Sequence, residues 1–155
     1  MSAAVTFRDM LAGDVVQLAL QPSQHAYLGI TRAVHGIEDG EELVAGGPAW
    51  TAIAADGRIL ACFGAKFLWP PKGDFTGHAV LWALLAAGLG FAQVALSRFI
   101  AERIAGSDIA RLEAIVRADV AAEPRWAAAV GMKRRAVLRR WGPEGADHIL
   151  FERIL

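Results

Sequence analysis

A glycine-rich turn between an apolar segment and an amphipathic one is the clearest chemical signal in the chain. Residues 82–91 read WALLAAGLGF, which predicts a strand, a Gly-x-Gly turn and the start of a helix. Backbone N–H groups remain free at such a helix N-terminus, where the helix dipole also favours negative charge. We expect Gly88 and Gly90 to form a site for a phosphate or pyrophosphate. The alternative is a tight strand-to-helix connection without a ligand.

Three titratable side chains are candidates for a general base. Glu113 alternates with apolar residues in a strand-like segment, so it could face a substrate. Its structural alternative is an ion pair with Arg111 or Arg117 on the same strand face. His78 starts another predicted strand, where an ordinary edge histidine is the alternative. Asp119 precedes a predicted helix, a position more typical of a cap, so Glu113 and His78 are the main candidates.

Other kinds of chemistry find no support in the sequence. Cys62 is the only cysteine and has apolar neighbours, so we expect a core side chain and no disulfide or thiolate metal cluster. The four histidines lack the spacing of a metal site, and none is expected. Gly-x-Ser-x-Gly and Walker-type motifs are absent, so hydrolase and nucleoside-triphosphatase activities are not indicated.

Length and charge indicate one domain without a strong electrostatic field. At 155 residues the chain can bury a core, and we expect a single domain over 1–155. Its 16 basic and 16 acidic residues cancel, so neither nucleic acid nor a membrane is an expected partner. No apolar run is long enough to span a bilayer, and the single cysteine favours a reducing compartment. We therefore expect a cytoplasmic protein, or a virion-associated one if it is phage-encoded. Trp69 and Trp141 lie at element ends, which is typical of a contact surface in a homodimer or larger assembly.

Periodicity and turn residues predict the elements that position these side chains. Asp14 is expected to cap a helix that continues to Leu20 and stops at Pro22. Asp56-Gly57 supplies the positive φ angles of a tight hairpin turn. The expected order is a strand at 5–7, helices at 15–20, 23–34 and 41–45, a hairpin of 50–54 and 59–69, a strand at 78–85, a helix at 91–105, a strand at 111–116, a helix at 122–130 and a terminal hairpin of 135–141 and 148–155.

This order, with a glycine turn between the fourth strand and the next helix, resembles the GCN5-related N-acetyltransferase (GNAT) superfamily. The resemblance implies an α/β fold with a central, mostly antiparallel mixed sheet of about six to seven strands, flanked by helices and splayed between strands 4 and 5. The family's pyrophosphate loop reads Gln/Arg-x-x-Gly-x-Gly/Ala. Residues 85–90 align with it, except that Leu85 replaces the polar first residue. Val130-Gly131-Met132 and the hairpin after it resemble the end of the family's domain.

The resemblance implies that the protein is an N-acyltransferase with acetyl-CoA as co-substrate and an amine of unknown identity as acceptor. A tyrosine of the last helix often serves as the family's general acid, but Ala127 occupies that position here, and the only tyrosine is Tyr27. The loop residues implied to bind the coenzyme are Leu85, Ala86, Ala87, Gly88, Leu89, Gly90 and Phe91.

Two features are similar to a phage or prophage branch of GNAT-like proteins. They are the strand Ala79–Leu84 and Trp126, five residues before Gly131. This similarity implies an alternative function, a catalytically silent domain that acts as a structural or accessory virion protein and docks into a phage assembly. A CoA-binding regulatory module is a third hypothesis. The missing tyrosine and Leu85 favour the silent domain, whereas the Gly-x-Gly turn favours coenzyme binding.

Overall fold

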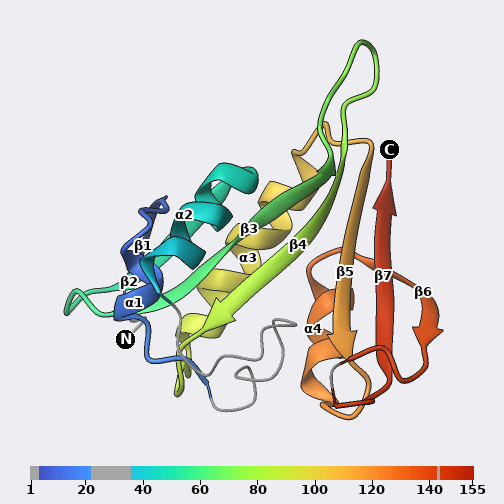
Figure 1. Cartoon of the computed structure of the whole chain (residues 1–155). Helices are drawn as coiled ribbons and strands as arrows, with labels where there is room; N and C mark the ends of the chain where they lie inside the picture. The colour runs from blue at the N-terminus through green and yellow to red at the C-terminus, as the bar shows by residue number, and fades with distance from the viewer. Residues whose placement is uncertain (1–3, 22–35, 143) are drawn as a thin grey trace. The chain divides into compact units, whose positions relative to one another are not determined.

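A computed structural model describes residues 4–21, 36–142 and 144–155, and the elements follow the expected order (Figure 1). The bounds of β3 and β4 agree with the sequence-based prediction, and those of β2, α3 and α4 differ from it by one residue. The elements are β1 (Val5–Asp9), α1 (Asp14–Gln17), α2 (Ile37–Gly46), β2 (Ala49–Ala54), β3 (Ile59–Trp69), β4 (His78–Leu85), α3 (Ala92–Ala105), β5 (Arg111–Arg117), α4 (Ala122–Ala129), β6 (Lys133–Leu138) and β7 (His148–Ile154).

Seven strands form one mixed sheet in the order β1-β2-β3-β4-β5-β7-β6. The pairs β1–β2, β2–β3, β5–β7 and β6–β7 are antiparallel, whereas β4 and β5 are parallel. The parallel ladder joins His78–Val80 to Arg111–Glu113, so it covers three residue pairs of the eight-residue β4. The expected α/β fold with a mixed sheet and flanking helices is confirmed.

The chain folds into two compact units. Unit 1 comprises Met1–Lys66 and Trp82–Leu96, and unit 2 comprises Phe67–Leu81 and Ser97–Leu155. The boundary passes through β3, β4 and α3, so each unit holds part of these elements. A single domain over 1–155 stays a prediction.

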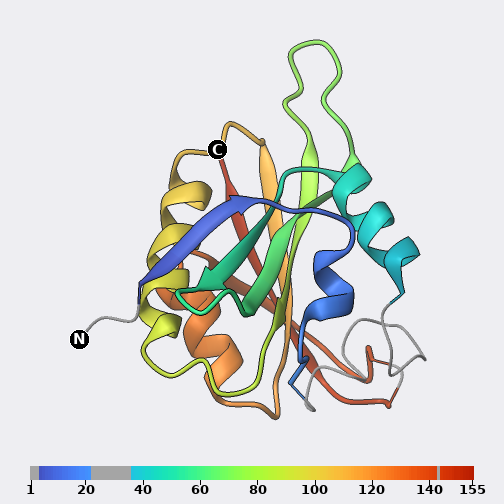
Figure 2. The same cartoon turned by 90° about the vertical axis from the view of Figure 1, so that its left-hand side faces the viewer.

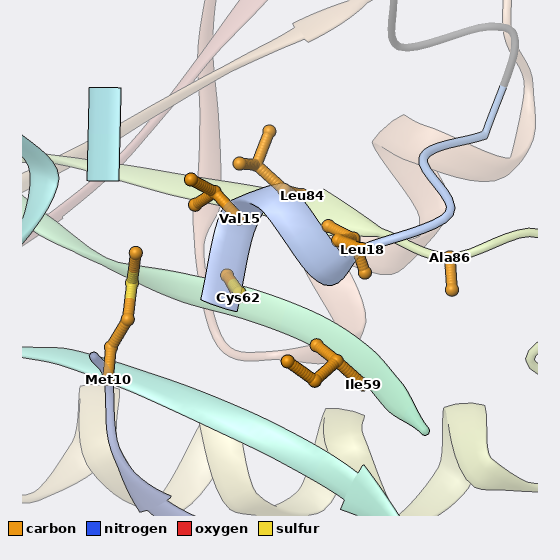
Figure 3. Close-up of a cluster of buried hydrophobic side chains, with 7 residues drawn as sticks. All are labelled: Met10, Val15, Leu18, Ile59, Cys62, Leu84 and Ala86. Atoms are coloured by element: carbon orange, nitrogen blue, oxygen red, sulfur yellow. The ribbon is translucent and has the colours of Figure 1, made fainter. Parts of the chain in front are cut away.

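Buried apolar side chains from α1, β3 and β4 form the core of unit 1 (Figure 3). Cys62 lies in this cluster with no exposed surface, and burial raises the pKa of its thiol to about 12. The prediction of a core cysteine is confirmed. The cluster consists of Met10, Val15, Leu18, Ile59, Cys62, Leu84 and Ala86.

Asp14 is a buried ion-pair partner and not the helix cap that the sequence predicts. Its side chain is 3% exposed and accepts hydrogen bonds from Arg8 at 2.7 and 2.8 Å. Thr51 Oγ1 donates a third hydrogen bond at 2.6 Å, and the Leu11 N–H donates a fourth at 2.9 Å. The carboxylate therefore joins β1, α1 and β2.

The N-terminal helices differ from the sequence-based prediction. α1 ends at Gln17, because Leu18 has an extended backbone with φ −76° and ψ 121°; the predicted continuation to Leu20 is wrong. The short helix expected at 41–45 is the second half of the ten-residue α2. The helix expected near 23–34 lies outside the described residues.

Alternation along β5 separates the core of unit 2 from a polar face. Leu112 and Val116 are buried with 1% and 8% exposure, and α4 packs against this strand with Ala127 at 1%. Because side chains alternate along a strand, Arg111 and Glu113 project from the opposite face. The two candidate catalytic strands, β4 and β5, thus bring polar residues to one face of unit 2.

The loop between β3 and β4 extends beyond the ends of these strands (Figures 1 and 2). Lys72 and Phe75 close its tip with reciprocal backbone hydrogen bonds of 2.9 and 3.2 Å. Trp69 at the base of the loop is 67% exposed, and Trp141 in the terminal hairpin is 54% exposed. Both indoles therefore lie on the surface of their unit, and a partner for them stays a prediction.

Candidate functional site

The glycine turn after β4 forms an open loop at the N-terminus of the 14-residue helix α3. Gly88 and Gly90 have φ angles of +71° and +53°, a region that glycine enters without steric cost. Ala92, Gln93 and Val94 donate their amide hydrogens to carbonyl oxygens within the turn, at 3.0 to 3.2 Å. The predicted strand–turn–helix motif is therefore present, and the first helical amides already have partners.

Four consecutive backbone amides in this loop have no acceptor within the described residues. They are the N–H groups of Gly88, Leu89, Gly90 and Phe91. A Cβ atom at either glycine would meet no atom within 4 Å, and Phe91 is 86% exposed, so the loop is open to a ligand. Unpaired amides at the positive end of a helix dipole favour an anion.

Hydrogen bonds fix the base of the loop within unit 1. The Ala86 N–H donates to Leu60 O at 2.9 Å, and the Ala87 N–H donates to Ala19 O at 3.2 Å. Gln21 donates its backbone N–H to Leu85 O at 2.9 Å and its side-chain Nε2 to Ala86 O at 3.0 Å. The segment before the loop is therefore held on both sides.

Gln21 and Ala19 are the contributors that sequence reasoning missed, because their pairing with the loop joins residues about 65 positions apart. Leu85 accepts the hydrogen bond from Gln21 through its backbone carbonyl oxygen. This hydrogen bond does not depend on which side chain stands at position 85. Leu89 packs against the core of unit 1, which fixes the middle of the loop.

The second group of predicted site residues lies in unit 2, where His78 and Glu113 meet. His78 Nε2 lies 3.3 Å from Glu113 Oε1, and their side chains are 17% and 15% exposed. Nε2 is buried and makes no directed hydrogen bond in the described structure, so the contact is electrostatic at this geometry. The structure thus brings together the two side chains that the sequence offered as separate candidates for the base.

Arg111 forms an ion pair with Glu113, which is the structural role that the sequence offered for this glutamate. Its Nε and Nη2 atoms both lie 2.7 Å from Glu113 Oε1, and Nη2 lies 2.9 Å from Glu152 Oε2. The hydrogen bonding of Arg111 to Glu113, which accepts, and the field of both carboxylates raise the pKa of Arg111. Arg135 Nε lies 3.5 Å from Glu152 Oε1, so two arginines and two carboxylates alternate around the cluster.

Glu152 was not foreseen as part of this cluster. It pairs directly with Glu113 in the antiparallel β5–β7 ladder, which places both carboxylates on one sheet face. The alternating pattern of residues 148–154 predicts the strand but not its register. The register alone decides which β7 residue lies beside Glu113.

Asp119 lies on the surface and takes part in neither group. Its carboxylate accepts hydrogen bonds from Arg117 at 2.9 and 2.7 Å, and this guanidinium lowers the pKa of Asp119. The N-cap residue of α4 is Ala121 and makes no side-chain cap, so the predicted capping role of Asp119 is wrong.

The position at which the GNAT resemblance implies a catalytic tyrosine is buried in this structure. Ala127 is 1% exposed in α4. Its neighbour Trp126 donates Nε1–H to Ser97 Oγ at 2.8 Å, which ties α4 to the part of α3 in unit 2. Tyr27 lies outside the described residues.

The described residues contain no group of three or more His, Cys, Asp or Glu side chains that could hold a metal ion. None of their helices combines the length and the apolar character that crossing a bilayer requires.

The strand order and the parallel β4–β5 pair belong to a GNAT-like α/β fold, as the likeness to solved structures shows. The spermidine N-acetyltransferase of Vibrio cholerae, solved with CoA and spermine, has a TM-score of 0.70 at 13% identity, over 97% of this chain and 95% of its own. The ribosomal-protein-alanine N-acetyltransferase of Brucella melitensis has a TM-score of 0.71 at 20% identity, over 97% and 99%. A phosphinothricin acetyltransferase of Sinorhizobium meliloti, solved with acetyl-CoA, has a TM-score of 0.69 at 15% identity, over 100% and 89%.

At these identities the likeness shows the fold alone. No protein-family model and no curated protein matches the chain. The three solved structures lend no support to the phage or prophage branch, which stays a prediction.

Proposed function

We propose that this protein is an acetyl-CoA-dependent N-acetyltransferase that transfers the acetyl group to an amine. The fold supports this proposal, because the similar structures from Vibrio cholerae and Sinorhizobium meliloti are acetyltransferases with CoA or acetyl-CoA bound. The acceptor stays open, since those proteins differ in the acceptors that their names give.

The observation that carries the proposal is the row of four unpaired amides from Gly88 to Phe91. A pyrophosphate offers several charged oxygens to such a row, and each hydrogen bond to a charged group contributes about 1.5–3 kcal/mol. The dipole of α3 adds about 0.3–1 kcal/mol for an anion at its N-terminus. The loop fits the coenzyme's diphosphate through backbone groups and needs no polar side chain at Leu85.

Acetyl-CoA would supply an activated thioester when bound. The chain's own part is to hold the diphosphate with the loop amides and to take a proton from the attacking amine. The described residues offer no tyrosine for the leaving thiolate, so we assign its protonation to solvent. CoA thiols have ordinary acidity, and water can supply this proton without a dedicated side chain.

Calorimetric titration with acetyl-CoA tests the proposal. We expect the wild type to bind, and Gly88→Trp to lower the affinity at least tenfold because the indole occupies the open loop. Gly57→Trp is the matched control, since Gly57 also has a positive φ, +85°, and open space around its Cβ position. Both substitutions introduce similar strain, of about 1–2 kcal/mol for an L-residue in this region.

Two results would contradict the proposal. The absence of heat from the wild type at millimolar acetyl-CoA would exclude coenzyme binding. Equal affinity of the Gly88→Trp and Gly57→Trp variants would exclude this loop as the site. If binding is observed, release of free thiol with a panel of primary amines separates transfer from binding alone.

A further inference from the structure

The contact between His78 and Glu113 is defined by the parallel β4–β5 ladder of unit 2. His78 pairs with Arg111 and Val80 with Glu113, so His78 and Glu113 are diagonal neighbours on one sheet face. Diagonal neighbours lie within reach of long side chains. The glutamate reaches His78 Nε2 at 3.3 Å, and both side chains are more than four-fifths buried.

Glu113 itself is poorly placed to take a proton from a substrate. Its Oε1 atom already lies 2.7 Å from both Nε and Nη2 of Arg111. Protonation of Glu113 would weaken these charge-assisted hydrogen bonds, which are roughly twice as strong as neutral ones. The arginine therefore holds the carboxylate in place, which suits an orienting role.

His78 has the complementary properties. Its Nε2 atom is buried against the carboxylate, so Nδ1 on the other side of the ring is the nitrogen left for a substrate. A carboxylate beside one ring nitrogen favours the tautomer with the proton on that nitrogen. The second nitrogen then carries a free lone pair and can accept a proton.

We propose that His78 is the general base of the acetyl transfer and that Glu113, fixed by Arg111, is its positioning residue. This inference rests on the proposed function and deepens it. The amine nitrogen forms a bond to the acetyl carbon as the carbon–sulfur bond breaks, and its proton passes to His78 Nδ1. The bonding electron pair leaves with sulfur, the thiolate takes a proton from water, and the imidazolium returns its proton to solvent.

Charged side chains from three strands surround His78. Arg111 and Glu113 face it from β5, Glu152 lies beside them on β7, and Arg135 reaches the cluster from β6. Only a neutral imidazole accepts a proton, so kcat/KM rises with pH as the ring is deprotonated.

Thiol release from acetyl-CoA, with the amine panel or with water as acceptor, tests the assignment at several pH values. We expect His78→Gln to lower kcat/KM at least a hundredfold and to abolish its rise with pH, as for a lost general base. We expect Glu113→Gln to lower kcat/KM about tenfold and to retain its rise with pH. Glu144→Gln, a surface carboxylate with a 57% exposed side chain, is the matched control and leaves the profile unchanged.

A second measurement needs no turnover. Nitrogen chemical shifts of the imidazole, assigned with His78→Gln, report which ring nitrogen carries the proton in the neutral form. We expect the proton on Nε2 in the wild type and a larger share of it on Nδ1 in Glu113→Gln.

The outcomes separate this assignment from the proposed function. A proton on Nδ1, or a pH profile that Glu113→Gln abolishes and His78→Gln retains, overturns the role of His78. No binding of acetyl-CoA overturns the proposed function, and binding without thiol release overturns acetyl transfer together with the base. The nitrogen shifts still decide whether Glu113 orients the ring.

Discussion

The carboxylate of Asp14 is the strongest candidate for a single polar side chain on which the stability of unit 1 depends. Asp14→Asn replaces the charged acceptor with a neutral amide of the same size. Thr51 has no exposed surface and donates to Asp14 at 2.6 Å, and the Leu11 N–H donates at 2.9 Å. Arg8 Nη2 donates to the other carboxylate oxygen, Oδ1, which the amide replaces with an NH2 group.

We expect Asp14→Asn to lower the free energy of unfolding by about 2–4 kcal/mol. The amide keeps one oxygen for Thr51 and Leu11, but its NH2 group meets Arg8 where Oδ1 accepted a hydrogen bond, and each hydrogen bond to a charged group contributes about 1.5–3 kcal/mol. For a chain of this size each kcal/mol lowers the melting temperature by about 2–4 °C. Thermal unfolding at neutral pH measures the effect. Asp56→Asn, which alters an exposed pair with Arg58, is the control and leaves the melting temperature unchanged.

The same variant has a pH signature. Burial acts to raise the pKa of Asp14, but the hydrogen bonds from Arg8, Thr51 and Leu11 outweigh it and lower the pKa below 3.8. A lowered pKa stabilises the fold above the unfolded value and loses this contribution as pH falls through the folded value. The difference between wild type and Asp14→Asn therefore shrinks below about pH 3.8. A constant difference down to pH 2, or no difference at pH 7, would refute the reasoning.

Two further predictions concern burial and backbone conformation. Cys62 should not react with a thiol reagent at pH 8 until the protein unfolds, because its thiol is fully buried with a pKa of about 12; rapid labelling of the native protein would contradict this. Gly77→Ala should lower the melting temperature more than Gly73→Ala, as measured by circular dichroism. Both glycines have positive φ, but a Cβ at Gly77 lies 2.7 Å from Phe67, whereas Gly73 is open; equal losses would rule out the steric argument.

The elements that the sequence predicts well are those with a strong local pattern. β4 is a continuous apolar run that ends in a Gly-x-Gly turn, and α3 carries apolar residues at helical spacing before Gly106. The Asp56-Gly57 turn is similarly local, and Gly57 has the expected positive φ. These motifs were enough to predict the fold and the position of the loop.

The features that the sequence did not predict depend on contacts between distant residues. Asp14 has the residue type of a cap, but Arg8 and Thr51 draw its carboxylate into a buried network. The chain after α1 leaves the helix and pairs with the end of β4, as the bridge between Leu20 and Ala86 shows. The His78–Glu113 contact needs the register of two parallel strands, which periodicity does not contain.

The pairing of residues 19–21 with the end of β4 also bears on aggregation. The Ala86 N–H points toward β3, whereas Leu85 O and the Ala87 N–H point the other way along the strand. An unpaired row of such groups is a template for a strand from another molecule. Gln21 donates to Leu85 O, and Ala19 O accepts from the Ala87 N–H, so both groups are paired within the chain. Among the described residues of the loop, the four amides from Gly88 to Phe91 stay unpaired. The four loop amides thus stay accessible, while the strand end beside them is already paired.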